Sequence, residues 1–334
     1  MLPPNCKFII AKRAKYLDQN SQKFFVDGIV KDYRLQKHDH VWDHHREHGT
    51  DCQIQEMQLP TTAGSLLQEL QICPHAQIIS PVYDPDAIIA GLYLILEKHH
   101  LLDPIVRERM LAVSLMCDHI IIPPYRYPTL QKYNLLAAKC IGTIYATREN
   151  WRQAFRLSRY ESQWREDEEV KLESACFSRM VEWFAQAIRG DSPWPGEFES
   201  LSRSHWKRVN SLKHKIIQDN LITLQDGIIV FDARTLPSRD PRAAYAAIRR
   251  LQLDRNLRIL TIWQNYSGSK FTFWTNPDHA EWSEFNYHTF ISKFNYYTGT
   301  NGGGRRTWGG SDWDKDILQH ISIPETIKLL KSHT

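Results

Sequence analysis

The stretch from Val26 to Arg46 is far denser in carboxylates and imidazoles than its surroundings. Its acids are Asp27, Asp32, Asp39 and Asp43, and its histidines are His38, His40, His44 and His45, with His48 just beyond. Carboxylate oxygens and imidazole nitrogens together suit Mn, Fe, Zn or Mg, and no nearby cysteine pattern favours a thiolate zinc site. This combination of residue types predicts a metal site.

Asp27 directly follows an apolar run, residues 24–26, that has the character of a buried strand. Open α/β sheets bind ligands where strands end, so the pattern predicts that Asp27 lies at a crevice. Two other interpretations stay open. The histidines can belong to a solvated surface loop, or His40, His44 and His48 can share one helical face, at i, i+4 and i+8, and hold a structural zinc ion.

A strand ending in Val26-Asp27, followed by Asp32 and then by Asp43-His44-His45, resembles the DHH phosphoesterase superfamily, and the spacing is closest to that of its small nuclease-like branches. The resemblance implies hydrolysis of a phosphodiester or phosphoanhydride with a divalent metal, usually Mn²⁺, with Mg²⁺ or Zn²⁺ as alternatives. It implies that Asp27, Asp43 and His44 are metal ligands. Asp43, His44 and His45 would form the catalytic group, with His45 orienting a ligand or donating to the phosphate.

Members of that superfamily begin with a strand and an Asp-x-Asp loop that supplies metal ligands, whereas Asp18 is the only acid between Met1 and Phe25 here. The segment Asp84-Pro85-Asp86, between a predicted strand at 76–80 and an apolar helix, is a candidate source of the missing ligands. It also suits a helix start, because Asp84 is a good N-cap, proline fits the first turn, and Asp86 favours the positive end of the helix dipole. Both interpretations stay open.

Asp118 follows a helix predicted from Pro104 to Met116, and by order and context it matches a further metal-binding aspartate of the superfamily. Its apolar neighbours are Met116, Cys117 and Ile120. A carboxylate among them would be costly to bury without a cation or hydrogen-bond donors. A metal, a salt bridge or a helix cap would each satisfy it.

A second candidate site is the predicted loop at Gly302, Gly303 and Gly304. Glycines can take positive φ, which lets backbone N–H groups converge on an anion. Arg305 and Arg306 add donors that match phosphate, and Trp308 offers a face to a base or sugar. The segment resembles the glycine-rich loop of the DHH-associated C-terminal domain, except that an arginine stands where a histidine is common. A flexible glycine turn beside a core tryptophan is the alternative.

The length of 334 residues predicts two domains joined by helices in an α/β fold. We expect a metal-binding domain with a mostly parallel sheet at 1–135, a helical insertion and linker at 136–222, and a smaller α/β substrate domain at 223–334. The net charge of +4 neither requires nor excludes nucleic acid. Six cysteines without a C-x-x-C pair predict reduced thiols, and no stretch approaches the roughly 20 apolar residues that span a bilayer. We therefore expect a cytoplasmic protein that does not bind membranes and is a monomer or homodimer.

Together these features predict a metal-dependent phosphoesterase that acts on a nucleotide, a dinucleotide or a short oligonucleotide. The missing N-terminal Asp-x-Asp loop leaves an alternative, which is a degenerate relative that binds nucleotide or nucleic acid without cleaving it.

Overall fold

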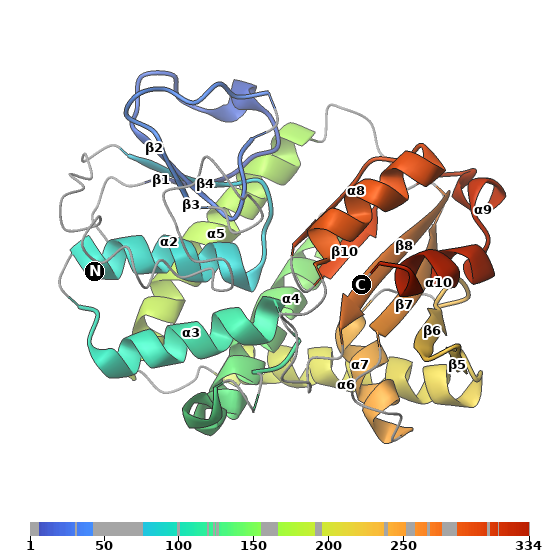
Figure 1. Ribbon diagram of the computed structural model, residues 1–334. Coiled ribbons are helices and arrows are strands. Elements are labelled where there is room, and N and C mark those ends of the chain that lie inside the picture. The colour runs from blue at the N-terminus through green and yellow to red at the C-terminus, as the bar shows by residue number, and fades with distance from the viewer. Residues whose placement is uncertain are drawn as a thin grey trace. The chain divides into compact units, whose positions relative to one another are not determined.

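The computed structural model describes residues 7–30, 32–42, 76–98, 101–118, 120–122, 124, 127–154, 166–190, 196–236, 240–251, 258–265, 268–275, 286–305, 308–312 and 314–333. Contacts divide the chain into two compact units, residues 1–122 with 129–206 and residues 123–128 with 207–334. The division at 206/207 lies inside helix α6 (Gly196–Gln218). Figure 1 shows the elements of both units. The domain boundaries expected at 135 and 222 stay a prediction.

The first unit contains a four-stranded sheet in the order β1-β4-β2-β3. Its strands are β1 (Lys7–Ile10), β2 (Lys23–Val26), β3 (His40–Trp42) and β4 (Gln77–Ser80). Strand β4 pairs in parallel with β1 and β2, and β2 pairs in parallel with β3. The predicted parallel sheet is confirmed, and all four carboxyl ends therefore reach the same edge.

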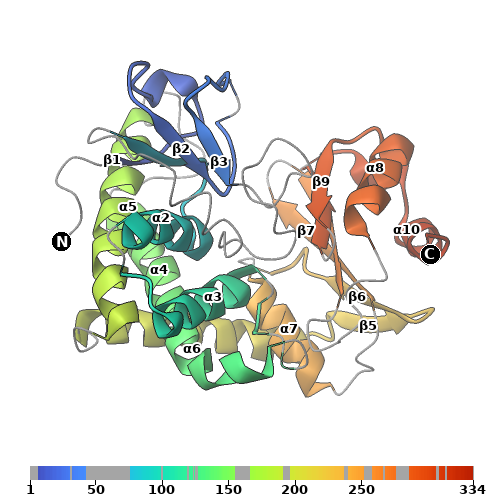
Figure 2. The same cartoon turned by 60° about the vertical axis from the view of Figure 1, so that its left-hand side comes forward.

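Four helices pack in the first unit, namely α2 (Pro85–Lys98), α3 (Pro104–Asp118), α4 (Asn134–Ala154) and α5 (Glu166–Arg189). Helices α2 and α5 contact the sheet, and α3 and α4 pack against these two helices. Helix α2 lies between the sheet and α3, as Figures 1 and 2 both show. A Cβ at Gly91 of α2 would lie 3.4–3.6 Å from Ile78 of β4, Phe177 of α5 and Phe8 of β1, so these elements meet closely. Phe25, Val41 and Ile79 belong to a separate buried cluster.

The second unit contains a six-stranded sheet in the order β5-β6-β7-β8-β10-β9. Its strands are β5 (Ile222–Gln225), β6 (Ile228–Asp232), β7 (Arg258–Asn265), β8 (Gly268–Thr275), β9 (Gly302–Arg305) and β10 (Trp308–Ser311). Only β6 and β7 pair in parallel among these. Its helices are α7 (Pro241–Arg250), α8 (Tyr287–Thr298), α9 (Ile317–His320) and α10 (Ile323–Lys331). The predicted α/β character of this part is confirmed.

Three boundaries differ from the sequence prediction. The sequence Ser267-Gly268-Ser269 predicts a hairpin turn, but the β7–β8 register ends at the pair Asn265–Gly268, so Gly268 belongs to strand β8. Residues 192–200, with two prolines and a glycine, predict a loop, but helix α6 begins inside this segment, at Gly196, and Phe198 is buried against Trp183. Residues 281–297 predict an aromatic helix, and the described helix there runs from Tyr287 to Thr298. No helix in the described part of the chain is long and apolar enough to cross a membrane.

Candidate functional site

Asp27 leaves the sheet at the carboxyl end of β2. Its φ of 56° lies in the left-handed region, which aspartate tolerates better than most residues. Its backbone N–H donates to the carbonyl of Trp42 at 2.8 Å, and the residue is 7% exposed. Trp42 is the last residue of β3, and Asp43 follows it directly in the chain. Asp27 therefore lies beside the point where the Asp43-His44-His45 motif begins.

The turn after Asp27 also touches the loop that follows β4. Gly28 has a φ of 127°, and a Cβ there would lie 2.7 Å from the Cγ of Pro81, so this position requires glycine. Pro81 begins the short connection from β4 to Asp84 and α2. Because β2 and β4 are parallel neighbours, the structure brings Asp27 and the connection to Asp84-Pro85-Asp86 to the same edge of the sheet.

Asp84 is the N-cap of α2. Its Oδ1 accepts hydrogen bonds from the backbone N–H groups of Asp86, at 3.1 Å, and Ala87, at 2.9 Å. This confirms the capping interpretation of the sequence and is the reason that α2 starts here. Whether Asp84 also binds a metal stays a prediction.

Asp86 is not the solvated first-turn acid that a helix dipole alone would favour, because it is only 1% exposed. Its Oδ1 accepts a hydrogen bond of 2.7 Å from the hydroxyl of Ser114 in α3. Asp118 is the last residue of α3, four residues after Ser114 and so one turn further along the helix. Ser114 was not predicted from the sequence, because its partner Asp86 lies on another helix, 28 residues away.

Other acids and histidines of the 26–46 stretch have local structural roles. The Oδ1 of Asp32 accepts from the N–H of Ala14 at 2.6 Å, and the Oδ2 of Asp39 accepts from the hydroxyl of Tyr33 at 2.8 Å. His40 is a residue of β3, with its ring stacked on Phe24 at 5.1 Å. A strand residue cannot share a helical face with His44 and His48, so the zinc-helix interpretation is wrong for His40.

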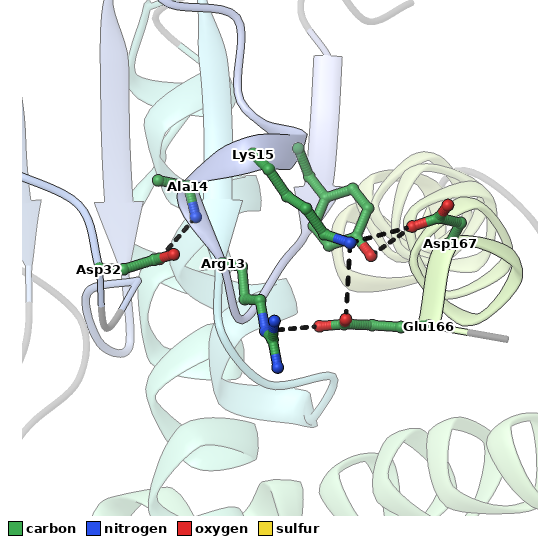
Figure 3. A network of polar contacts seen from close by, with 7 residues as sticks. Arg13, Ala14, Lys15, Asp32, Glu166 and Asp167 are labelled. Carbon is green, nitrogen blue, oxygen red and sulfur yellow. Dashed lines mark hydrogen bonds and ion pairs between the residues drawn. The ribbon is translucent and has the colours of Figure 1, made fainter. Parts of the chain in front are cut away.

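The carboxyl end of β1, where superfamily members carry an Asp-x-Asp loop, is basic in this chain. Figure 3 shows it joined to the start of α5. Arg13 Nε lies 3.3 Å from Glu166, Lys15 Nζ lies 3.4 Å from Asp167, and the Tyr16 hydroxyl donates to Asp167 at 2.5 Å. The hydrogen bond from Tyr16 is the main reason that the pKa of Asp167 is lowered, with Lys15 adding to it. This segment fastens two elements together.

The predicted glycine loop is wrong as a conformation, because Gly302–Arg305 is strand β9, paired antiparallel with β10. Gly302, Gly303 and Gly304 have no positive φ, so they do not form the expected anion nest. A Cβ on Gly302 would lie 2.3 Å from the carbonyl oxygen of Gly310, which explains the glycine by close approach of two backbones. The register sets Arg305 opposite Trp308.

Part of the candidate set lies outside the described residues, namely Asp43, His44, His45 and Arg306. Asp118 is described as the end of α3, without its side chain. Among the described residues, no three side chains of His, Cys, Asp or Glu gather closely enough to hold a metal ion. The ligand and catalytic roles of the predicted residues, and the substrate role of Gly302 to Trp308, therefore stay predictions.

No family model and no curated protein matches the chain. Solved structures similar to it include a pGpG-specific phosphodiesterase from Vibrio cholerae, at 9% identity and a TM-score of 0.46, over 94% of this chain and 100% of that one. Another is described as a member of the s1p family of ribosomal proteins, DHH domain, at 13% identity and a TM-score of 0.43, over 87% of this chain and 63% of that one. A third is CDC45 from Entamoeba histolytica, at 8% identity and a TM-score of 0.33, over 93% and 84%.

One similar structure is thus a DHH domain. That is the family which Asp43-His44-His45 resembles in sequence.

Proposed function

We propose that this chain is a DHH-type, metal-dependent phosphoesterase of the cytoplasm that hydrolyses a phosphodiester or phosphoanhydride in a nucleotide, a dinucleotide or a short oligonucleotide. One observation carries the proposal. The backbone of Asp27 is hydrogen-bonded to Trp42, the residue before Asp43, and the adjoining Gly28 touches Pro81 in the connection to Asp86. The chain therefore leaves one edge of one parallel sheet at Asp27, after Trp42 and at Pro81, and an acidic segment follows or begins at each of these points.

The residues at this edge fit a hard divalent cation by their donor type. Asp27 and Asp86 are residues of which 7% and 1% is exposed, and a buried carboxylate gains from a nearby cation. With Asp43, Asp84, Asp118 and the imidazole of His44, they would supply the oxygen and nitrogen donors that suit Mn²⁺, with Mg²⁺ or Zn²⁺ as alternatives. Such an ion, when bound, supplies hydroxide near neutral pH and polarises a phosphoryl oxygen.

The protein's own side chains have separate tasks in this proposal. Asp27, held in a fixed turn by Trp42 and Gly28, keeps its carboxylate at the strand end. His45 orients a ligand or donates to the reacting phosphate. In the second unit, Arg305 and Arg306 would bind the non-reacting phosphate, and Trp308 would stack on a base or sugar.

A second candidate function is nucleotide or nucleic-acid binding without cleavage. The observation that favours it is the basic carboxyl end of β1, where Arg13 and Lys15 pair with Glu166 and Asp167 in a place that carries metal-binding acids in the superfamily. In that case the Asp84-Pro85-Asp86 segment serves only as a helix start.

The test is turnover of linear and cyclic dinucleotides, mononucleotides and short single strands with Mn²⁺. We expect Asp27→Asn and Asp43→Ala to lower kcat/KM by more than the roughly 100-fold that loss of an outer partner of a metal ligand can cost. Asp32→Asn is the matched control, because it removes a charge from the same stretch but keeps an oxygen for the N–H of Ala14. Nucleotide binding with no turnover by the wild type would favour the second function. Full activity of Asp27→Asn would exclude the proposed site.

A further inference from the structure

The contact between Asp86 and Ser114 is a polar bond between two helices in the interior of the first unit. Asp86 lies in the first turn of α2, and Ser114 lies in the last part of α3. Each residue is 1% exposed, and their oxygens are 2.7 Å apart. Their neighbours along the helices, such as Ile89 and Val113, are completely buried and apolar. Burying polar groups in such a place lowers the stability of the fold unless they are hydrogen-bonded.

A hydroxyl beside a carboxylate can act only as the donor to it, because an ionised carboxylate is acceptor-only. When Asp86 is ionised, as a metal ligand would be, the bond is charge-assisted, and it ties Oδ1 to a helix that does not carry the carboxylate. Holding one oxygen of the planar group restricts its rotation about the terminal side-chain torsion, which is otherwise broad. The direction of the second carboxylate oxygen, Oδ2 of Asp86, is then fixed as well.

Ser114 also stands between two of the predicted ligands. It bonds Asp86, and Asp118 follows it by one turn on the same helix. Asp86 in turn belongs to the segment whose first residue after β4, Pro81, touches Gly28 beside Asp27. The Ser114 hydroxyl thus connects helix α3 to the segment that begins at the sheet edge where Asp27 lies.

We infer that Ser114 is a positioning residue, which holds the carboxylate of Asp86 in the orientation that binds the divalent cation. The inference rests on the proposed function, because it assumes that Asp86 is a ligand. It assigns Ser114 no contact with the substrate and no role in the chemical step. Its effect should therefore appear first in metal affinity.

The experiment measures the dissociation constant of Mn²⁺ by equilibrium dialysis, with the melting temperature recorded separately. Ser114→Ala should weaken Mn²⁺ binding by about 10-fold to 100-fold, the usual effect of removing an outer partner of a metal ligand. Ser114→Thr keeps the hydroxyl and should restore most of the affinity. If Ser114→Ala does not fold, Ser114→Cys, which has a weak donor at similar size, should bind Mn²⁺ less tightly than Ser114→Thr.

Thr143→Val is the matched control, because it removes a buried hydroxyl from α4 that bonds the carbonyls of Lys139 and Phe198. A role confined to folding would lower the melting temperature of both Ser114→Ala and Thr143→Val while leaving Mn²⁺ affinity unchanged, and would overturn the inference. Wild-type affinity in Ser114→Ala or Ser114→Cys overturns it too, while the proposed function stands. Absence of Mn²⁺ binding by the wild type instead overturns the proposed function and this inference with it.

Discussion

Asp27 shows how a single backbone conformation can place a carboxylate. A left-handed φ costs an L-residue about 1–2 kcal/mol, so neighbouring contacts have to hold it. Here the N–H bond to Trp42 and the close approach of Gly28 to Pro81 fix the chain on both sides of the turn. The chain therefore leaves β2 in one direction, beside the residue that precedes Asp43.

The glycines of β9 give a residue-scale prediction. Gly302→Ala should lower the free energy of unfolding by about 1–3 kcal/mol, because its Cβ would overlap the Gly310 carbonyl oxygen, 2.3 Å away, and backbone cannot move aside easily. Gly303→Ala is the control in the same strand, since a Cβ there meets nothing within 4 Å, and its effect should stay within about 0.5 kcal/mol. Urea unfolding measures both. Equal effects of the two substitutions would contradict the close-approach explanation.

The sequence predicted those residue roles that depend on nearby residues. Asp84 was recognisable as a helix cap because the groups it bonds are two and three residues away. Ser114 was not recognisable, because its partner is 28 residues away on another helix. The sequence predicted Gly302 to be a loop glycine. The reason for glycine there is the backbone of Gly310, and the pairing of these two strands is not visible in the sequence.

Among the elements, β1 and α5 are joined by charge as well as by apolar packing. Phe8 of β1 contacts Phe177 of α5 edge to face, at 5.3 Å between ring centres. Beyond the strand, Arg13, Lys15 and Tyr16 meet the two acids that begin α5 (Figure 3). The acidic first turn of α5 also suits the positive end of its dipole.

Asp167→Asn tests this link through its pH dependence. A carboxylate with a lowered pKa stabilises the fold above the ordinary pKa of 3.8, and this contribution is lost as pH falls through the lowered value. The variant should therefore melt below the wild type at pH 7, and the difference should vanish at pH values well under 3.8. It should also shrink in 1 M salt, where screening acts within about 3 Å.

Glu168→Gln removes the neighbouring charge of the same helical turn and controls for the helix dipole. A difference between Asp167→Asn and the wild type that is constant across pH, or equal to that of Glu168→Gln, would contradict the specific link to Lys15 and Tyr16. Thermal unfolding followed by circular dichroism supplies these values.

Element types were predictable where periodicity and caps agree, as in α2 and α3. The order β1-β4-β2-β3 was not, because β4 pairs with two strands that lie more than about 50 residues earlier in the chain, as Ile78 does with Phe24. That order is what puts β4 beside β2 and so brings the Asp84-Pro85-Asp86 segment to the edge where Asp27 lies.

At the scale of the whole molecule, the candidate residues are divided between the two compact units. The sheet edge at which Asp27 lies belongs to the first unit, and strand β9 with Arg305 belongs to the second. The proposed chemistry is thus assigned to the first unit and substrate recognition to the second. The length and the α/β pattern predicted two such parts, whereas a division inside α6 has no sequence signal, because the helix continues across it.

The central claim is that the acids leaving this one sheet edge share a divalent cation. Anomalous diffraction from a crystal of the wild-type protein soaked in Mn²⁺ tests it most directly. We predict a manganese peak within about 2.0–2.6 Å of carboxylate oxygens of Asp27, Asp43 and Asp86, the range of oxygen ligands to hard divalent ions. A peak bound elsewhere, or no peak while these three carboxylates are ordered and apart, would contradict the account.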